Sequence, residues 1–182
     1  TASGAGGAAL DGLPITVDNE ANLAALGELH AGPSGPASFL YVSGEIGIGA
    51  GIVLHGSLFR GARGWSGELG HVAVRPDGPA CRCGAQGCLE QYAGQEAILR
   101  AAAVGGTDDL RAGAEAGRPA VLAALASAGT ALGVAVAGVV NLLDVEEVVL
   151  GGIYAPLAPW LCPAVAAEIH HRVLTDAWSP VD

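Results

Sequence analysis

The sequence predicts one mixed α/β domain, in which helices cover the faces of a β-sheet. β-rich runs alternate with runs of helical spacing along the chain, the usual pattern of such a fold. Hydrophobic residues make up 51% of the 182 residues and charged residues 14%, so burial can offset the entropy lost on folding. This length suits one well-buried domain, or most of a larger one, and no internal repeat is found.

The first half of the chain predicts a strand, a helix and a hairpin. Residues 14–18 (PITVD) alternate as in a short strand, and residues 19–31 combine good helix formers with apolar residues at helical spacing. Glycines and prolines at 32–36 end that helix. The β-rich runs at 38–43 and 51–55 flank the glycine-dense EIGIGA, which predicts a β-hairpin.

The second half is predicted to be mainly helical. A loop-rich stretch at 56–94, containing a short strand at 71–74 (HVAV), comes first and is the expected place for chemistry. Beyond it, four segments have helical spacing: 91–103, 108–116, 119–143 and 157–174. The run EEVVL at 146–150 predicts a buried strand that stops at a glycine pair.

The segment 119–143 is long enough to cross a bilayer and carries no charge. It is rich in Ala and Gly and contains Ser127, Thr130 and Asn141, so its transfer into lipid is only weakly favourable. We therefore predict a buried central helix and no membrane association.

The net charge bears on DNA binding, and the cysteines bear on the cellular location. The formal charge is −10, and the eight basic residues, all Arg, are scattered along the chain, so DNA contact requires a separate domain. Four cysteines without a basic, apolar leader favour a reducing, cytoplasmic location over a secreted disulfide framework. The sequence contains no Met and begins with small residues, so we expect it to be part of a longer protein.

Three thiols and an imidazole within eighteen positions predict a structural zinc site: His71, Cys81, Cys83 and Cys88. Zn²⁺ takes four N or S ligands tetrahedrally, and a closed set of three Cys and one His leaves no open coordination position. The alternatives are ordinary buried thiols or a disulfide between Cys81 and Cys88. We favour the metal, because core cysteines seldom fall in a glycine-rich loop beside a histidine. Cys162 is expected in the core.

GELGH at 67–71, followed by CRCGAQGCLE at 81–90, resembles the signature of the ROK family of sugar kinases and sugar-responsive transcriptional repressors. VDNEANLAALGE at 17–28 and VVLGG at 148–152 support the resemblance. It implies an actin-like ATPase (ribonuclease H-like) fold. It also implies that residues 1–182 are the larger, C-terminal lobe, with the N-terminal lobe and any winged helix-turn-helix outside this chain.

The resemblance implies a sugar site made of Asn19, Glu20, Glu68, His71 and Glu90. A polyol needs convergent acceptors, and hydrogen bonds to charged groups are stronger than neutral ones. His71 would direct one ring nitrogen to zinc and the other to a sugar hydroxyl. The alternatives are solvated charges for the glutamates and a helix N-cap for Asn19.

Two departures from the kinase pattern favour a sensor. Glu20 stands where the family's kinases have Asp, and its extra methylene moves the carboxylate by about 1 Å, which can reduce a rate about 10²-fold. Ile46 replaces a hydroxyl of the phosphate-binding hairpin, and Glu45 adds a negative charge beside it, unless that side chain faces solvent.

We therefore expect the effector-binding lobe of a ROK repressor, with a small-molecule sugar as ligand, structural Zn²⁺ as cofactor, DNA bound only through an N-terminal domain, and a homodimer or homotetramer as the family resemblance implies. The alternative is an ATP-dependent hexose kinase that uses Mg²⁺ and has Glu20 as its catalytic base.

Overall fold

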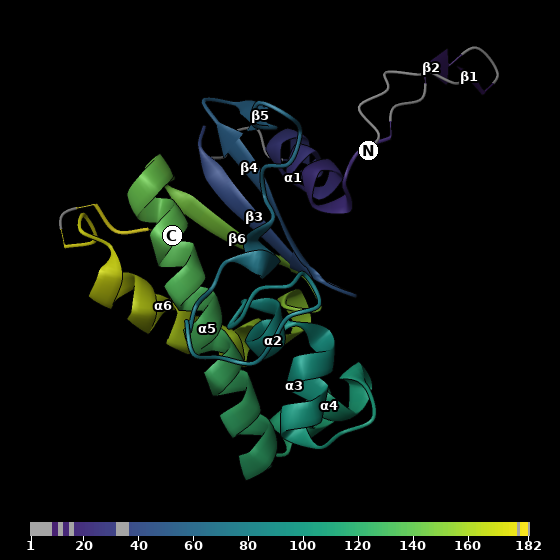
Figure 1. Cartoon of the computed structure of the whole chain (residues 1–182), viewed down its shortest axis with the longest axis vertical. Coiled ribbons are helices and arrows are strands. Elements are labelled where there is room, and N and C mark those ends of the chain that lie inside the picture. The colour runs from purple at the N-terminus through teal and green to yellow at the C-terminus, as the bar shows by residue number, and fades with distance from the viewer. Residues whose placement is uncertain (1–8, 11–12, 15–16, 32–36, 178, 182) are drawn as a thin grey trace.

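A computed structural model describes residues 9–10, 13–14, 17–31, 37–177 and 179–181. Its main sheet has four strands in the order β5-β4-β3-β6 (Figure 1). Strand β3 (Phe39–Gly44) pairs antiparallel with β4 (Ile48–Leu54) and parallel with β6 (Glu147–Gly152), and β5 (Ser57–Phe59) pairs antiparallel with β4. The predicted mixed α/β fold is confirmed.

Alternate residues of β3 face two different layers. Leu40 and Val42 belong to the main hydrophobic core, which extends to the buried face of helix α5 (Pro119–Leu143). Phe39 belongs to a second cluster, with Ala25 of helix α1 (Glu20–Ala31). Side chains of a strand alternate between its two faces, so α1 covers one face of the sheet and the main core lies on the other.

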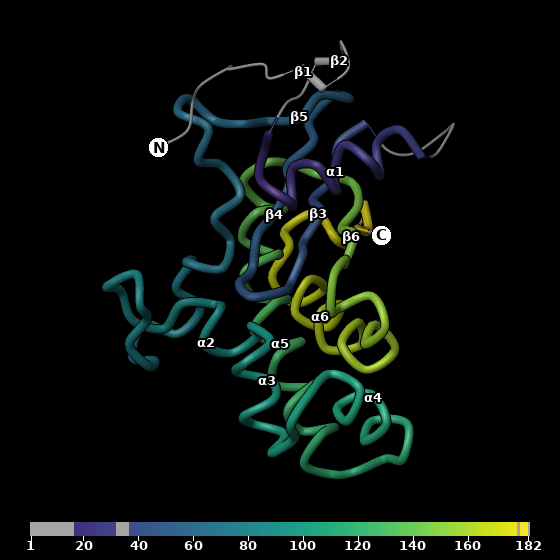
Figure 2. The backbone as a smooth tube through the Cα atoms, turned by 90° about the vertical axis from the view of Figure 1, so that its right-hand side faces the viewer, coloured from purple at the N-terminus to yellow at the C-terminus, as the bar shows by residue number. Residues whose placement is uncertain are grey.

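The other helices follow in the predicted order. They are α2 (Glu90–Ala93), α3 (Gln95–Ala102), α4 (Thr107–Glu115) and α6 (Ala158–Arg172), with a two-stranded ribbon of β1 (Ala9–Leu10) and β2 (Leu13–Pro14) at the start of the chain. Helices α3 and α4 lie at the opposite end of the molecule from α1, as both views show (Figures 1 and 2).

Helix α5 is a core helix, as its small residues predict. Among the described residues it is the helix that is long and apolar enough to cross a membrane, and 61% of its most apolar window is buried inside the fold. Its glycines let α6 approach closely: a Cβ atom on Gly133 would lie 2.6 Å from Cβ of Glu168 and 2.9 Å from the carbonyl oxygen of Val165. The Ala- and Gly-rich composition is therefore explained by helix packing.

Several local expectations were wrong. The stretch 71–74 is not a strand, because Leu69–His71 form a 3-10 helix and only Ala73 makes a bridge, to Cys88. The helix predicted at 91–103 is divided at Gly94, whose extended conformation (φ −64°, ψ 152°) ends α2 and precedes α3. Cys162, expected in the core, is exposed.

The strands also differ from expectation at their ends. Val17 and Asp18 are not in a strand, and residues 15–16 of the strand predicted at 14–18 lie outside the described residues. Strand β4 begins at Ile48, so much of the glycine-dense stretch is strand rather than turn. Strand β6 lies at the edge of the sheet and is half-buried rather than buried, because among the described strands only β3 pairs with it.

Candidate functional site

The four predicted metal ligands come together in one cluster. One ligand atom from each of His71, Cys81, Cys83 and Cys88 lies within 4.8 Å of all the others. The Sγ atoms of Cys83 and Cys88 are 3.7 Å apart. Tetrahedral Zn–S bonds of about 2.3 Å place two sulfur atoms about 3.8 Å apart, so the spacing fits a zinc ion. All four cysteines are free, which contradicts the disulfide alternative.

The backbone fixes this cluster through turns at both ends. The N–H of Cys81 donates to the carbonyl of Ala85 at 2.8 Å, and the N–H of Gly84 donates to the carbonyl of Cys81 at 3.0 Å. At the other end, the N–H of Leu89 donates to the carbonyl of Val72 at 2.8 Å. These bonds bring Cys88 back to His71, so one closed loop carries all four side chains.

The thiols of this loop differ in acidity. A hydrogen bond from the backbone N–H of Cys83 lowers the pKa of Cys81 to about 7, and His71 assists. Burial raises the pKa of the Cys88 thiol to about 12. A bound cation favours the thiolate of both, because metal ligation requires deprotonated sulfur. The donor set therefore suits a borderline-soft metal ion.

A cavity of about 350 Å³ lies beside the cluster, and all five residues of the predicted sugar site line it: Asn19, Glu20, Glu68, His71 and Glu90. The size falls in the range of small-molecule sites. His71 belongs both to the Cys/His cluster and to the cavity wall, and its Nδ1 lies 3.9 Å from Sγ of Cys81. The Cys/His cluster and the cavity thus share a side chain.

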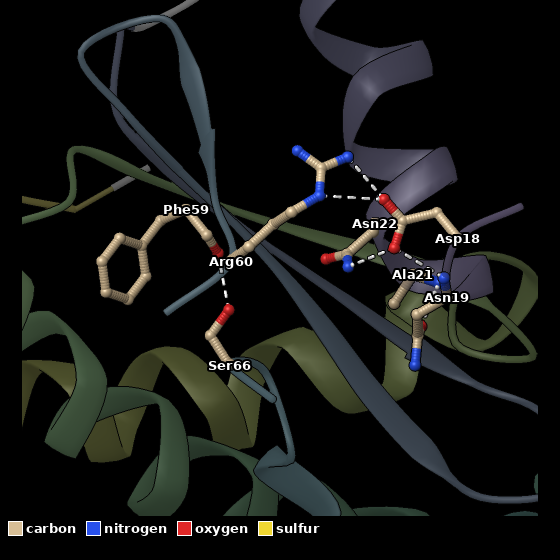
Figure 3. Close-up of polar contacts among 7 residues, drawn as sticks. All are labelled: Asp18, Asn19, Ala21, Asn22, Phe59, Arg60 and Ser66. Carbon is tan, nitrogen blue, oxygen red and sulfur yellow. Dashed lines mark hydrogen bonds and ion pairs between the residues drawn. The ribbon is translucent and has the colours of Figure 1, made fainter. Parts of the chain in front are cut away.

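The start of α1 forms one wall of the cavity. Asn19 is the N-cap of this helix, because its Oδ1 accepts a hydrogen bond from the N–H of Ala21 at 2.9 Å. Figure 3 shows its amide nitrogen pointing away from this contact. The capping alternative therefore holds for Oδ1, whereas the amide N–H groups of Asn19 take no part in the cap. Beside it, Oε1 of Glu20 accepts a hydrogen bond from the buried Ser43 hydroxyl at 3.2 Å.

The tip of the β3–β4 hairpin forms another wall. Glu45 and Ile46 both line the cavity, and both are exposed, Ile46 to 85% of its surface. The backbone N–H of Glu45 donates to the carbonyl of Gly47 at 2.9 Å, which closes the tip as a tight turn. Glu45 is therefore both exposed to solvent and part of the cavity wall.

A polar network next to the cavity was missed by the sequence reasoning. The carboxylate of Asp18 accepts hydrogen bonds from the N–H of Asn19, the amide of Asn22 and the guanidinium of Arg60, the last with Nη2 at 2.5 Å (Figure 3). Arg60 follows β5, and Ser66 nearby donates to the carbonyl of Phe59 at 2.6 Å. The network ties the start of α1 to the loop that leads to GELGH. Ser43 was also missed, because nothing in its local sequence marks it.

Asp18→Asn is expected to lower the free energy of unfolding at pH 7 by about 1–2 kcal/mol. Hydrogen bonds, first from Asn22 and then from Arg60, hold the pKa of the Asp18 carboxyl below its usual value. A lowered folded-state pKa stabilises the fold above the unfolded pKa of about 3.9, and this stabilisation is lost as the pH falls through the folded pKa. Urea unfolding between pH 7 and pH 3 measures the difference.

The matched control is Asp77→Asn, which removes the same charge from an exposed side chain. It should change the free energy of unfolding by less than about 0.5 kcal/mol at any pH. A difference between wild type and Asp18→Asn that stays constant down to pH 3 would contradict the assignment.

Comparison with known proteins identifies relatives of two functional kinds. A family model described as "ROK family" matches residues 9–182. The glucokinase of Halalkalibacterium halodurans is 36% identical over 161 residues, which are 77% of this chain and 49% of that protein. The xylose repressor of Caldicellulosiruptor bescii is 36% identical over 159 residues, 76% of this chain and 40% of the repressor. The chain thus spans half or less of the length of these curated relatives.

Among solved structures, the crystal structure of a ROK family transcriptional regulator, described as a homologue of the E. coli MLC protein, matches with a TM-score of 0.85 and 30% identity. The match covers 94% of this chain and 47% of that one. The expected actin-like ATPase fold is confirmed by the family match together with this structural neighbour. The family match over nearly all of the sequence and the agreement in fold lead to one conclusion, that the chain belongs to the ROK family.

Proposed function

We propose that this chain is the sugar-sensing, effector-binding lobe of a ROK-family transcriptional regulator. The observation that carries the proposal is the cavity lined by Asn19, Glu68, His71 and Glu90, which come from three separate stretches of the sequence. Carboxylates and an imidazole offer acceptors for hydroxyl groups on several sides of a small polyol.

The same cavity argues against phosphoryl transfer. Four glutamates line it, Glu20, Glu45, Glu68 and Glu90, and no Arg is among the lining residues of the described part of the chain. Phosphoryl transfer depends on stabilising the negative charge of the phosphates, which the carboxylate of Glu45 would oppose. The apolar side chain of Ile46 has no donor to offer a phosphate oxygen.

We further propose that zinc is the resident metal, held by His71, Cys81, Cys83 and Cys88. With four protein ligands, the ion would have a structural role and would hold the loop that immediately precedes Glu90. In the intact regulator, a sugar that binds two conformations of the protein with different affinity would shift their equilibrium and so control an N-terminal winged helix-turn-helix. We place this chain as the C-terminal lobe of that cytoplasmic protein, a homodimer or homotetramer.

A hexose kinase is the second candidate. The hydrogen bond from Ser43 holds the Glu20 carboxylate at the cavity wall, where a general base would be needed. The glucokinase and the repressor are equally identical to this chain, so identity does not favour either. The acidic hairpin tip is the reason for preferring the sensor.

In the intact protein that contains this chain, we expect D-glucose or D-xylose to bind without ATP turnover. Glu68→Gln should weaken binding about 10–100-fold, because a charge-assisted hydrogen bond contributes about 1.5–3 kcal/mol. Isothermal titration calorimetry measures the affinity, and a coupled assay of ADP release measures turnover.

Glu96→Gln, an exposed position in the first turn of α3, removes the same charge away from the cavity and should leave the affinity unchanged. Sugar-dependent ATP turnover of about 1–100 s⁻¹, the usual range of kinases, would reject the sensor and establish the kinase.

A further inference from the structure

Arg82 links the metal loop, which is the segment from His71 to Cys88 with the four proposed zinc ligands, to the cavity. It lies between two of the proposed zinc ligands, Cys81 and Cys83, and its Nη2 is 3.5 Å from Oε1 of Glu90. Among the described residues, this is the ion pair that joins the metal loop to a glutamate of the cavity wall. The Arg82 side chain is 66% exposed, whereas that of Glu90 is only 11% exposed.

The negative charge of the Glu90 carboxylate is stabilised by the nearby guanidinium of Arg82. With 11% exposure it is poorly hydrated, and three other glutamates line the same cavity. A poorly hydrated charge is costly unless an opposite charge or hydrogen bonds compensate it. Its other oxygen, Oε2, lies against the hairpin tip, where a Cβ atom on Gly47 would be 2.7 Å away.

The two ends of this contact are fixed by different means. Arg82 is part of the turn closed by the bond from Gly84 to Cys81, the turn that also aligns the thiols. At the other end, the buried Tyr154 hydroxyl donates to the carbonyl of Ala93 at 2.8 Å and so anchors the last residue of α2. The backbone of Glu90 is thereby held, and Arg82 is the cation that lies beside its carboxylate.

We propose that Arg82 is a positioning residue that orients the Glu90 carboxylate for a sugar hydroxyl and transmits the order of the metal loop to the cavity. This inference rests on the proposed function, because it uses Glu90 as a sugar contact. Its consequence is that loss of the metal weakens sugar binding partly through the displacement of Arg82.

The test measures D-glucose and D-xylose binding by calorimetry, and zinc content by atomic absorption, in variants of the intact protein. Arg82→Ala should weaken binding about 5–10-fold, the range of a single partly exposed charged contact, with zinc content unchanged. Arg82→Lys should recover affinity to within about twofold, because it restores the cation, whereas Arg82→Gln should not. In a Glu90→Gln background, Arg82→Ala should cause no further loss.

Arg111→Ala removes an arginine from an exposed pair with Glu115 on α4 and should leave the affinity unchanged. Wild-type affinity in Arg82→Ala, loss of its zinc, or an equal loss in the Glu90→Gln background would overturn the inference. If neither sugar binds the wild type, the proposed function fails by itself. The inference is then decided by denaturant unfolding of Arg82→Ala, Glu90→Gln and the double variant: additive effects overturn it, and non-additive effects support it.

Discussion

Replacing Cys88 by Ser is expected to abolish zinc binding and to disorder the loop between His71 and Glu90. Cys88 is fully buried, and the N–H of Leu89 next to it closes the loop onto Val72. A serine hydroxyl is a poor ligand for Zn²⁺, and structural zinc contributes about 10–16 kcal/mol of binding free energy in small zinc-binding peptides at pH 7. Elemental analysis should find zinc falling from about one ion per chain to below about 0.1.

Sugar binding should fall with it, by at least about tenfold, because one side chain serves both sites. His71 lines the cavity as well as the metal cluster, and Glu90 follows Cys88 by two positions. Treating the wild type with a chelator should reproduce both losses.

The control for this experiment is Cys162→Ser. Cys162 is exposed on α6, outside the cluster, and its replacement should leave the zinc content and the thermal unfolding midpoint unchanged. Full zinc occupancy in Cys88→Ser would show that the cluster does not hold the ion.

The parts of the site that could be predicted are those written in short stretches of sequence. CRCGAQGC places three thiols within eight positions, and any fold that closes this loop brings them together. The five predicted sugar-site residues line one cavity, although Asn19 and Glu90 are far apart in sequence. Composition and spacing could not have predicted that these residues share a site. The family resemblance predicted it.

What could not be predicted depends on contacts between distant segments. The pair of Asp18 and Arg60 spans 42 positions, and no local pattern marks either residue as a partner of the other. Arg82 and Glu90 are only eight positions apart, but no helical or strand spacing relates them, so their ion pair depends on how the loop between them folds. The position of β6 in the sheet could not be predicted either. Its apolar run suits a central strand, but β6 is an edge strand.

The stretch HVAV shows why alternation alone misled. Its alternation suits a strand, but its backbone groups form hydrogen bonds with residues 87–89. The N–H of Val74 donates to the carbonyl of Gly87 at 2.9 Å, and the carbonyl of Val72 accepts from the N–H of Leu89. A loop that closes on itself around the Cys/His cluster satisfies these groups without a sheet. Short alternating runs beside glycine-rich ligand motifs are therefore weak predictors of strands.

Replacing Gly67 by Ala is expected to dislodge the segment that carries Glu68 and His71. Gly67 has a φ of +90°, and a Cβ atom there would overlap the carbonyl oxygen of Ala50 in β4. The carbonyl of Gly67 also accepts a hydrogen bond from the N–H of Ala50 at 2.8 Å, so the segment cannot move away without breaking this bond. We expect a loss of about 3–5 kcal/mol in the free energy of unfolding and at least about tenfold weaker sugar binding, measured by denaturant unfolding and calorimetry.

Gly64→Ala separates the two causes of this effect. Gly64 also has a positive φ, +76°, but a Cβ atom there has nothing within 4 Å. Its replacement carries only the strain of the left-handed backbone, about 1–2 kcal/mol, and should leave sugar affinity within about twofold of wild type. If the two alanine variants lost equal stability and equal affinity, backbone strain alone would explain Gly67, and the contact with β4 would not be what holds Glu68 and His71 against the cavity.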